Sequence, residues 1–275
     1  MTLPRISDLG FGIRRILAPN PSMMTGPGTN TYLLGREDVA VIDPGPALPE
    51  HLERICAEAG RIRWIFVTHT HPDHSPGAAV LAKQTGAELI GMPPPATSHQ
   101  DQSFEPDWQL DDGHSLETTE FELVAVHTPG HASNHVCYHH LESNWLITGD
   151  HVIDGSTVVI NPPDGNMRDY IRSLERVLEL GVDAILPGHG ERIDEPDKIV
   201  QWIIDHRLAR EEKVVAAFRK RVTASAAELV PDVYADVPEH LHGWAERSLL
   251  AHLIKLVEDG RAAENSRQFS WLENR

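Results

Sequence analysis

His69-Thr70-His71-Pro72-Asp73-His74 is the most informative stretch of the chain, and it directly follows the apolar run Ile62–Val67, which predicts a buried strand. Three imidazoles and a carboxylate therefore lie within six residues, in a loop that can direct all four side chains inward. His69 and His71 are two positions apart and share one side of an extended segment, whereas Asp73 and His74 begin the turn into a helix predicted from Gly77. The pattern predicts a metal site with one ion at each pair. A solvated histidine-rich loop is the alternative.

Three later apolar runs each end at a glycine beside a further residue of a type that binds metals, which argues against the solvated loop. The runs lie before T-P-G-H, T-G-D and P-G-H-G, and they contribute His131, Asp150 and His189. Glycine lets the backbone turn sharply or approach a neighbouring group closely at such strand ends. The repeated arrangement predicts that several strand ends supply ligands to one site.

The motifs H-T-H-P-D-H, T-P-G-H, T-G-D and P-G-H-G together resemble the metallo-β-lactamase-fold hydrolases in order and spacing, over about residues 11–200. The resemblance implies an α/β fold, the four-layer αββα sandwich, with metals at one rim. It also implies the assignment of two metal sites: His69, His71 and His131 at one, Asp73, His74 and His189 at the other, with Asp150 bridging. Asp73 would also be catalytic, because it would orient the attacking water.

Imidazole and carboxylate ligands suit zinc, and also iron or manganese, so two Zn²⁺ are the expected cofactors. Two close cations can share a hydroxide, since each lowers the pKa of bound water from about 15.7 toward roughly 7. The expected reaction therefore needs no serine or cysteine nucleophile. Two subgroups fit poorly: zinc β-lactamases typically have cysteine or serine where this chain has Asp150, and the 38 residues between Asp150 and His189 are too few for the inserted domain of β-CASP nucleases.

The last part of the chain has a different pattern, so we divide the sequence into a catalytic domain, 1–205, and a winged-helix-like domain, 206–275. A helical run from Pro196 to Arg221 is followed by a second helical segment from Thr223, whose Ser225 and Glu228 are spaced as a capping box. A third helix near Leu241–Asp259 precedes a two-stranded wing within 261–273.

A second resemblance covers nearly the full chain. His206-Arg207-x-x-Arg210-Glu211, with the early Gly28-Thr29-Asn30-Thr31-Tyr32-Leu33, is similar to the lactamase-β-like-2 group, which includes the animal mitochondrial endoribonuclease and bacterial relatives. The resemblance implies metal-dependent cleavage of single-stranded RNA.

Charge argues against a polyanionic substrate. The net charge is -17, and the excess lies within residues 1–205, which have 13 Lys or Arg against 30 Asp or Glu. The catalytic part should therefore repel RNA at long range, and bound cations would offset this only locally.

The N-terminal residues have no continuous apolar segment, and no run of eighteen apolar residues follows, so we expect a soluble cytoplasmic protein without membrane association. Cys56 and Cys137 lack metal-binding spacing and are read as buried apolar residues. The sequence leaves the oligomeric state open, with a homodimer as one expectation.

Several local predictions depend on strand patterns. Residues 11–17 are read as an edge strand, His135 as a core residue or a neighbour of the ligands, and His139 and His140 as surface residues. Asp43 has two equally supported roles: it either fixes the ring of a ligand histidine or caps a turn.

Three functions remain open. The first is a dinuclear hydrolase whose bridging hydroxide attacks a phosphodiester, most simply in single-stranded RNA. The second is a thioester or other acyl hydrolase of the glyoxalase II type acting on a small molecule, which the ligand motifs fit equally but the winged helix does not. The third is a winged-helix binding protein with a vestigial metal site.

Overall fold

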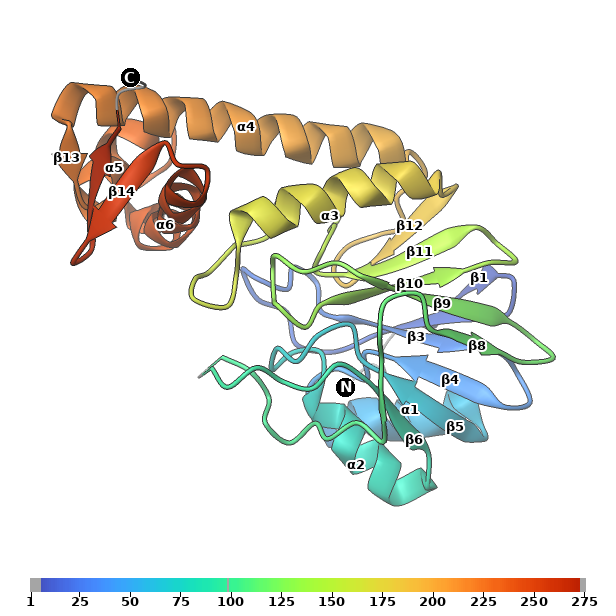
Figure 1. Ribbon diagram of the computed structural model, residues 1–275. Helices are drawn as coiled ribbons and strands as arrows, with labels where there is room; N and C mark the ends of the chain where they lie inside the picture. Colours follow the sequence, from blue (N-terminus) through green and yellow to red (C-terminus); the bar gives the residue numbers. More distant parts are fainter. Residues whose placement is uncertain (1–5, 98, 273–275) are drawn as a thin grey trace. The chain divides into compact units, whose positions relative to one another are not determined.

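The computed structural model describes residues 6–97 and 99–272 of the chain (Figure 1). These residues form two compact units. The first comprises residues up to Thr128 together with Asn134–Val158 and Leu180–Pro196, and the second comprises Pro129–Ser133, Val159–Glu179 and the residues from Asp197 onward.

The first unit contains two mixed β-sheets. One sheet has seven strands in sequential order: β1 (Ile6–Gly10), β2 (Ile13–Leu17), β3 (Asn30–Leu34), β4 (Val39–Ile42), β5 (Ile62–Phe66), β6 (Glu88–Gly91) and β7 (Trp108–Gln109). Strands β1 to β4 pair antiparallel, and β4 to β7 pair parallel. The other sheet has the order β12 (Ala184–Pro187), β11 (Trp145–Gly149), β10 (Val136–His140), β9 (Glu122–His127) and β8 (Ser115–Glu117), with β11 and β12 parallel.

Strand β4 in the first sheet is apolar on both faces, and the alternation of side chains explains where each face packs. Ala40 and Ile42 join a core that also includes residues of the other sheet, such as Tyr138 and Leu186. Val41 faces the opposite way, into a core shared with helices α1 (Pro49–Ala59) and α2 (Pro76–Thr85). The two sheets therefore enclose one apolar layer, and helices cover the outer face of the first sheet.

The second unit contains the helices α3 (Met167–Leu180) and α4 (Pro196–Arg221), which begin or end at its boundary, and a winged-helix region. That region has α5 (Ala226–Val233), a short 3₁₀ turn η1 (Glu239–Leu241), α6 (His242–Glu258) and a sheet of β13 (Thr223–Ala224), β15 (Gln268–Trp271) and β14 (Ala262–Asn265). The predicted capping box is present, since the Ser225 hydroxyl accepts from the Glu228 amide and the Glu228 carboxylate accepts from the Ser225 amide. No helix in residues 6–97 and 99–272 is long and apolar enough to span a membrane.

Two predictions of secondary structure need correction. The edge of the first sheet is β1, because Ile6–Gly10 pairs with β2 and leaves residues 13–17 between two neighbours. Thr223 and Ala224 do not begin a helix; they pair with Ser270 and Phe269 of the wing. The sandwich of two sheets followed by a winged helix is as predicted.

Candidate metal centre

The loop after β5 is anchored by Asp43, which follows β4. The Asp43 carboxylate accepts hydrogen bonds from the amide and the hydroxyl of Thr68, both at 2.7 Å, and from Nδ1 of His74 at 2.8 Å. Asp43 is 2% exposed, so these bonds are shielded from water. Of its two expected roles, the structure shows the contact with a histidine ring, which is the arrangement that fixes a ring orientation for metal binding.

Two glycines let the other strand ends approach this loop. A Cβ on Gly149 would lie 2.3 Å from Oγ1 of Thr68, and the φ of Gly149 is +46°. A Cβ on Gly188 would lie 2.8 Å from Cε1 of His74 and 2.9 Å from Oδ1 of Asp150. Only residues without a side chain permit this packing, which brings Asp150 and His189 to the loop.

Five of the predicted ligands form two overlapping groups within the first unit. The ligand atoms of each group lie within 4.8 Å of one another, and the groups are His69, His74 and Asp150, and Asp73, His74 and His189. Nε2 of His189 lies 3.2 Å from both Oδ2 of Asp73 and Oδ1 of Asp150. Nε2 of His74 lies 3.4 and 3.3 Å from the same two oxygens. Asp150 thus stands at the junction of the groups, where a bridging ligand was expected.

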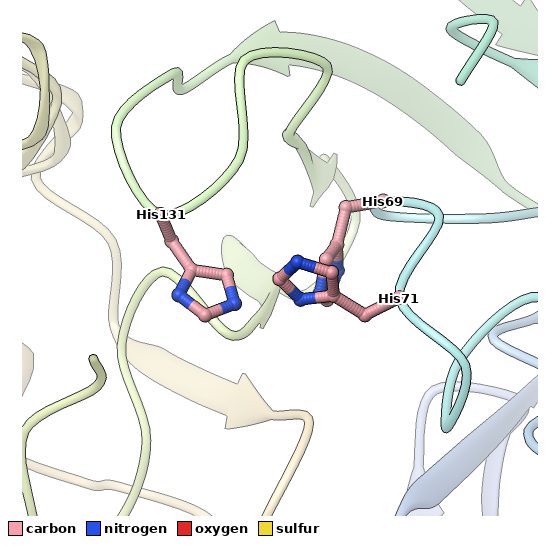
Figure 2. Close-up of side chains that lie close together, drawn as sticks. All are labelled: His69, His71 and His131. Carbon is pink, nitrogen blue, oxygen red and sulfur yellow. The ribbon is translucent and has the colours of Figure 1, made fainter. Parts of the chain in front are cut away.

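A third group contains His69, His71 and His131, again with ligand atoms within 4.8 Å (Figure 2). Nε2 of His69 and Nδ1 of His71 are 2.8 Å apart. His131 belongs to the second unit, where its Nδ1 lies 2.9 Å from the carbonyl oxygen of Val159. All seven predicted ligands therefore occur in the ligand groups of the described residues.

The groups attract positive charge strongly. Burial alone would lower the pKa of His74, but the carboxylates of Asp73, Asp150 and Asp43 raise it well above the ordinary value. Burial likewise opposes protonation of His189, yet Asp150 and Asp73 raise its pKa to about 10. Burial favours the neutral carboxyl of Asp73 and Asp150, but the neighbouring histidines hold both pKa values below the usual range.

These side chains fit a pair of divalent cations. Imidazole nitrogens and carboxylate oxygens are the donors that zinc, iron and manganese accept, and the carboxylates favour a positive charge at this position. The clusters are consistent with a dinuclear metal site. The space is preserved by Gly188, where any larger residue would contact both His74 and Asp150.

Residues that support His189 were not predicted from the pattern of strand ends. Nδ1 of His189 lies 3.1 Å from the Gly28 carbonyl, and the Asn30 amide donates to the carbonyls of Pro187 and Gly190, both at 2.9 Å. The Tyr32 hydroxyl also donates to Pro187, at 2.7 Å. The segment Gly28–Leu33 was noted in the sequence as part of a family resemblance, but nothing in its spacing indicated this role.

The remaining histidines differ in position. His135 is buried, as expected, and its ring stacks on His69 with centroids 5.0 Å apart. His140 is also buried and its Nδ1 lies 2.8 Å from the Ser143 hydroxyl, so its prediction as a surface residue was wrong. The strand alternation explains this, because His140 is on the same inward face as Val136 and Tyr138. His139 is partly buried.

Comparison with known families gives two matches. Residues 24–189 match the model described as the metallo-beta-lactamase superfamily, and residues 225–271 match the beta-lactamase associated winged helix domain. A Drosophila melanogaster protein named "Beta-lactamase-like protein 2 homolog" is 33% identical, over 94% of this chain and 92% of that protein. An Aspergillus chevalieri protein named "Atrochrysone carboxyl ACP thioesterase" is 30% identical, over 95% of this chain and 86% of that protein.

Solved structures agree on the fold. A metallo-beta-lactamase family protein from Thermus thermophilus has a TM-score of 0.79 at 22% identity, covering 96% of this chain and all of that one. A beta-lactamase domain protein from Burkholderia ambifaria has a TM-score of 0.81 at 22% identity, covering 98% and 95%.

Proposed function

Because the chain belongs to the metallo-beta-lactamase superfamily, we propose that its site hydrolyses an acyl thioester. The chain is a hydrolase of that superfamily with a histidine and aspartate metal site and a winged helix. The observation that carries the proposal is the overlap of the ligand groups at His74, with Asp150 at their junction. This overlap supports two closely spaced cations, which we expect to be zinc, with iron or manganese as alternatives.

Each group at the site would have a separate role in hydrolysis. Bound cations would supply a water molecule with a lowered pKa and an electrophilic contact for a carbonyl oxygen. Asp73 is the more accessible of the two site carboxylates, at 27% side-chain exposure against 13% for Asp150, so it is placed to accept a hydrogen bond from that water and orient it. The Asp43 carboxylate accepts a hydrogen bond from Nδ1 of His74, and the Gly28 carbonyl accepts one from Nδ1 of His189. In each histidine this leaves Nε2 directed into the site.

Two observations favour a thioester over RNA. The acidic excess within residues 1–205 repels an extended polyanion such as RNA, whereas an uncharged thioester such as an acyl-pantetheine would not meet this repulsion. The winged helix no longer argues against acyl hydrolysis, because a relative named as a thioesterase matches 95% of this chain. Single-stranded RNA remains the second candidate, supported by the basic run Arg219-Lys220-Arg221 at the end of α4.

The test compares substrates and variants. Chelator-treated protein is reloaded with Zn²⁺, Mn²⁺ or Fe²⁺ and assayed for thiol release from a panel of acyl-CoA and acyl-pantetheine esters, and for cleavage of labelled single-stranded RNA. Asp73→Asn should lower kcat by about 10²-fold or more, because it removes the carboxylate that holds the water in position. His131→Ala should also abolish turnover without unfolding the protein.

The matched control is Asp183→Asn, which makes the same chemical change at an exposed position. It should retain full activity. RNA cleavage without thiol release would favour the second candidate. Failure on both substrates would favour a winged-helix binding protein, and full activity of Asp73→Asn would refute the assigned role of Asp73.

A further inference from the structure

The first unit also has a cavity that is separate from the ligand groups. A cavity of about 400 Å³ opens between the two sheets, on the side where β7 ends one sheet and β8 ends the other. None of the residues that line it is among the seven proposed metal ligands. Its volume is within the range of small-molecule sites, roughly 300–1,000 Å³.

The inner end of the cavity is apolar. Phe66 and Tyr138 meet edge to face there, with ring centroids 5.2 Å apart. The Tyr138 hydroxyl donates to the Val67 carbonyl at 2.6 Å, so its hydrogen is already used within the protein. Leu123 and Ala125 of β9 add aliphatic surface. A ligand group at this end must therefore be hydrocarbon, because a polar group would lose its hydrogen bonds with water.

The mouth of the cavity is different in character. Trp108 is 54% exposed there, so its ring offers apolar surface to a ligand that enters the cavity. Gln109, His114 and Ser115 also line the mouth and offer hydrogen-bonding groups. Asp111 lies beside them, with 84% of its side chain exposed and its Oδ2 3.9 Å from Nε2 of His114.

We propose that this cavity binds an uncharged amphiphile, with its aliphatic or aromatic part against Phe66 and Tyr138 and its polar end among Gln109, His114 and Ser115. A cavity of about 150 Å³ lined by apolar side chains binds benzene, so the larger volume here accommodates a longer chain or a fused ring. The Asp111 carboxylate and the acidic excess of residues 1–205 disfavour an anionic head group. The ligand class is therefore closer to a medium-chain alcohol than to a fatty acid anion.

The test uses N-phenyl-1-naphthylamine, an uncharged probe whose emission rises in an apolar site, with 1-decanol and decanoate as competitors. The full-length protein should bind the probe, and decanol should displace it at lower concentration than decanoate. Leu116→Trp places a larger side chain in the cavity and should weaken probe binding by about tenfold or more. A tenfold loss equals the free energy of burying roughly two methylene groups of the probe.

The matched control is Leu141→Trp, the same change at an exposed leucine of the turn between β10 and β11 that does not line the cavity. It should bind the probe as the wild type does. Ala125→Leu fills the inner end of the cavity and serves if Leu116→Trp lacks a cooperative thermal transition.

Undiminished probe binding in folded Leu116→Trp or Ala125→Leu would overturn the site. Preferential displacement by decanoate would overturn the assignment of an uncharged ligand. Because the assay measures probe binding without turnover, its outcome is independent of the proposed thioesterase activity.

Discussion

Asp43→Asn provides the sharpest test of how the metal site is supported. The Asp43 carboxylate accepts on both oxygens: the Thr68 amide donates to Oδ1, and the Thr68 hydroxyl and His74 contact Oδ2. Asparagine has one acceptor oxygen and one NH₂ group. The NH₂ group therefore takes the place of one acceptor oxygen in either orientation of the amide. In one orientation it faces the Thr68 N–H, and in the other it faces Nδ1 of His74.

The expected cost follows from the burial of these groups. An unsatisfied buried donor costs about 1–3 kcal/mol, so the metal-free variant should lose that much free energy of unfolding. Loss of a carboxylate that orients a ligand histidine typically weakens metal binding by about 10–100-fold. An ion held by the proposed ligands Asp73, His74 and His189 should be affected more than one held by His69, His71 and His131, because Asp43 contacts His74 directly.

Urea unfolding of the metal-free proteins measures the first effect, and competition with a chromophoric chelator measures the second, resolving the two ions. Asp183→Asn is the control and should match the wild type in both measurements. If Asp43→Asn binds two ions with wild-type affinity, the hydrogen bond from His74 to Asp43 does not support a metal ligand, and the reasoning is refuted.

Three further predictions concern other parts of the fold. Gly149→Ala should lower the free energy of unfolding by about 2–4 kcal/mol in a thermal melt, because its Cβ would overlap the Thr68 side chain at a positive φ; wild-type stability would contradict the close contact between the end of β11 and the loop after β5. Burial lowers the pKa of His51 from 6.5 to about 4, so the folded state favours the neutral ring. The free energy of unfolding should therefore be highest above pH 6.5 and fall by about 3 kcal/mol as the pH drops to 4. Urea melts should show that loss in the wild type relative to His51→Gln, and parallel pH profiles would disprove it. Ser225→Ala should cost about 0.5–2 kcal/mol by removing the cap of α5, measured by urea unfolding against Ser266→Ala as the control; equal losses would show that the box contributes nothing.

The sequence was most informative where residues of metal-binding types stand at the ends of predicted strands. Apolar runs that stop at a glycine beside histidine or aspartate predicted which residues would converge, because strand ends on one side of a sandwich meet at one rim. The supporting contacts could not be predicted in the same way. Asn30 and Tyr32 reach Pro187, which is more than 150 residues later in the chain, and no local pattern indicates such a partner.

The errors also have local explanations. His140 was assigned to the surface by its polarity, although its position two residues after Tyr138 places it on the inward face of β10. The strand at residues 6–10 was missed because it is short and lacks a clear alternation, and its stability comes from pairing with β2. The cavity at the β7 and β8 edge depends on where two short strands end, which composition does not reveal.

The hydrogen bonds of Asn30 and Tyr32 have a mechanical consequence. Both residues are on β3, and both hold the carbonyl of Pro187 on β12 of the opposite sheet. An apolar interface alone resists separation of two layers but opposes lateral sliding only weakly, since dispersion contacts are non-directional. Directional hydrogen bonds at the rim oppose such sliding, so we expect them to limit changes in the distance between Asp73 and His189.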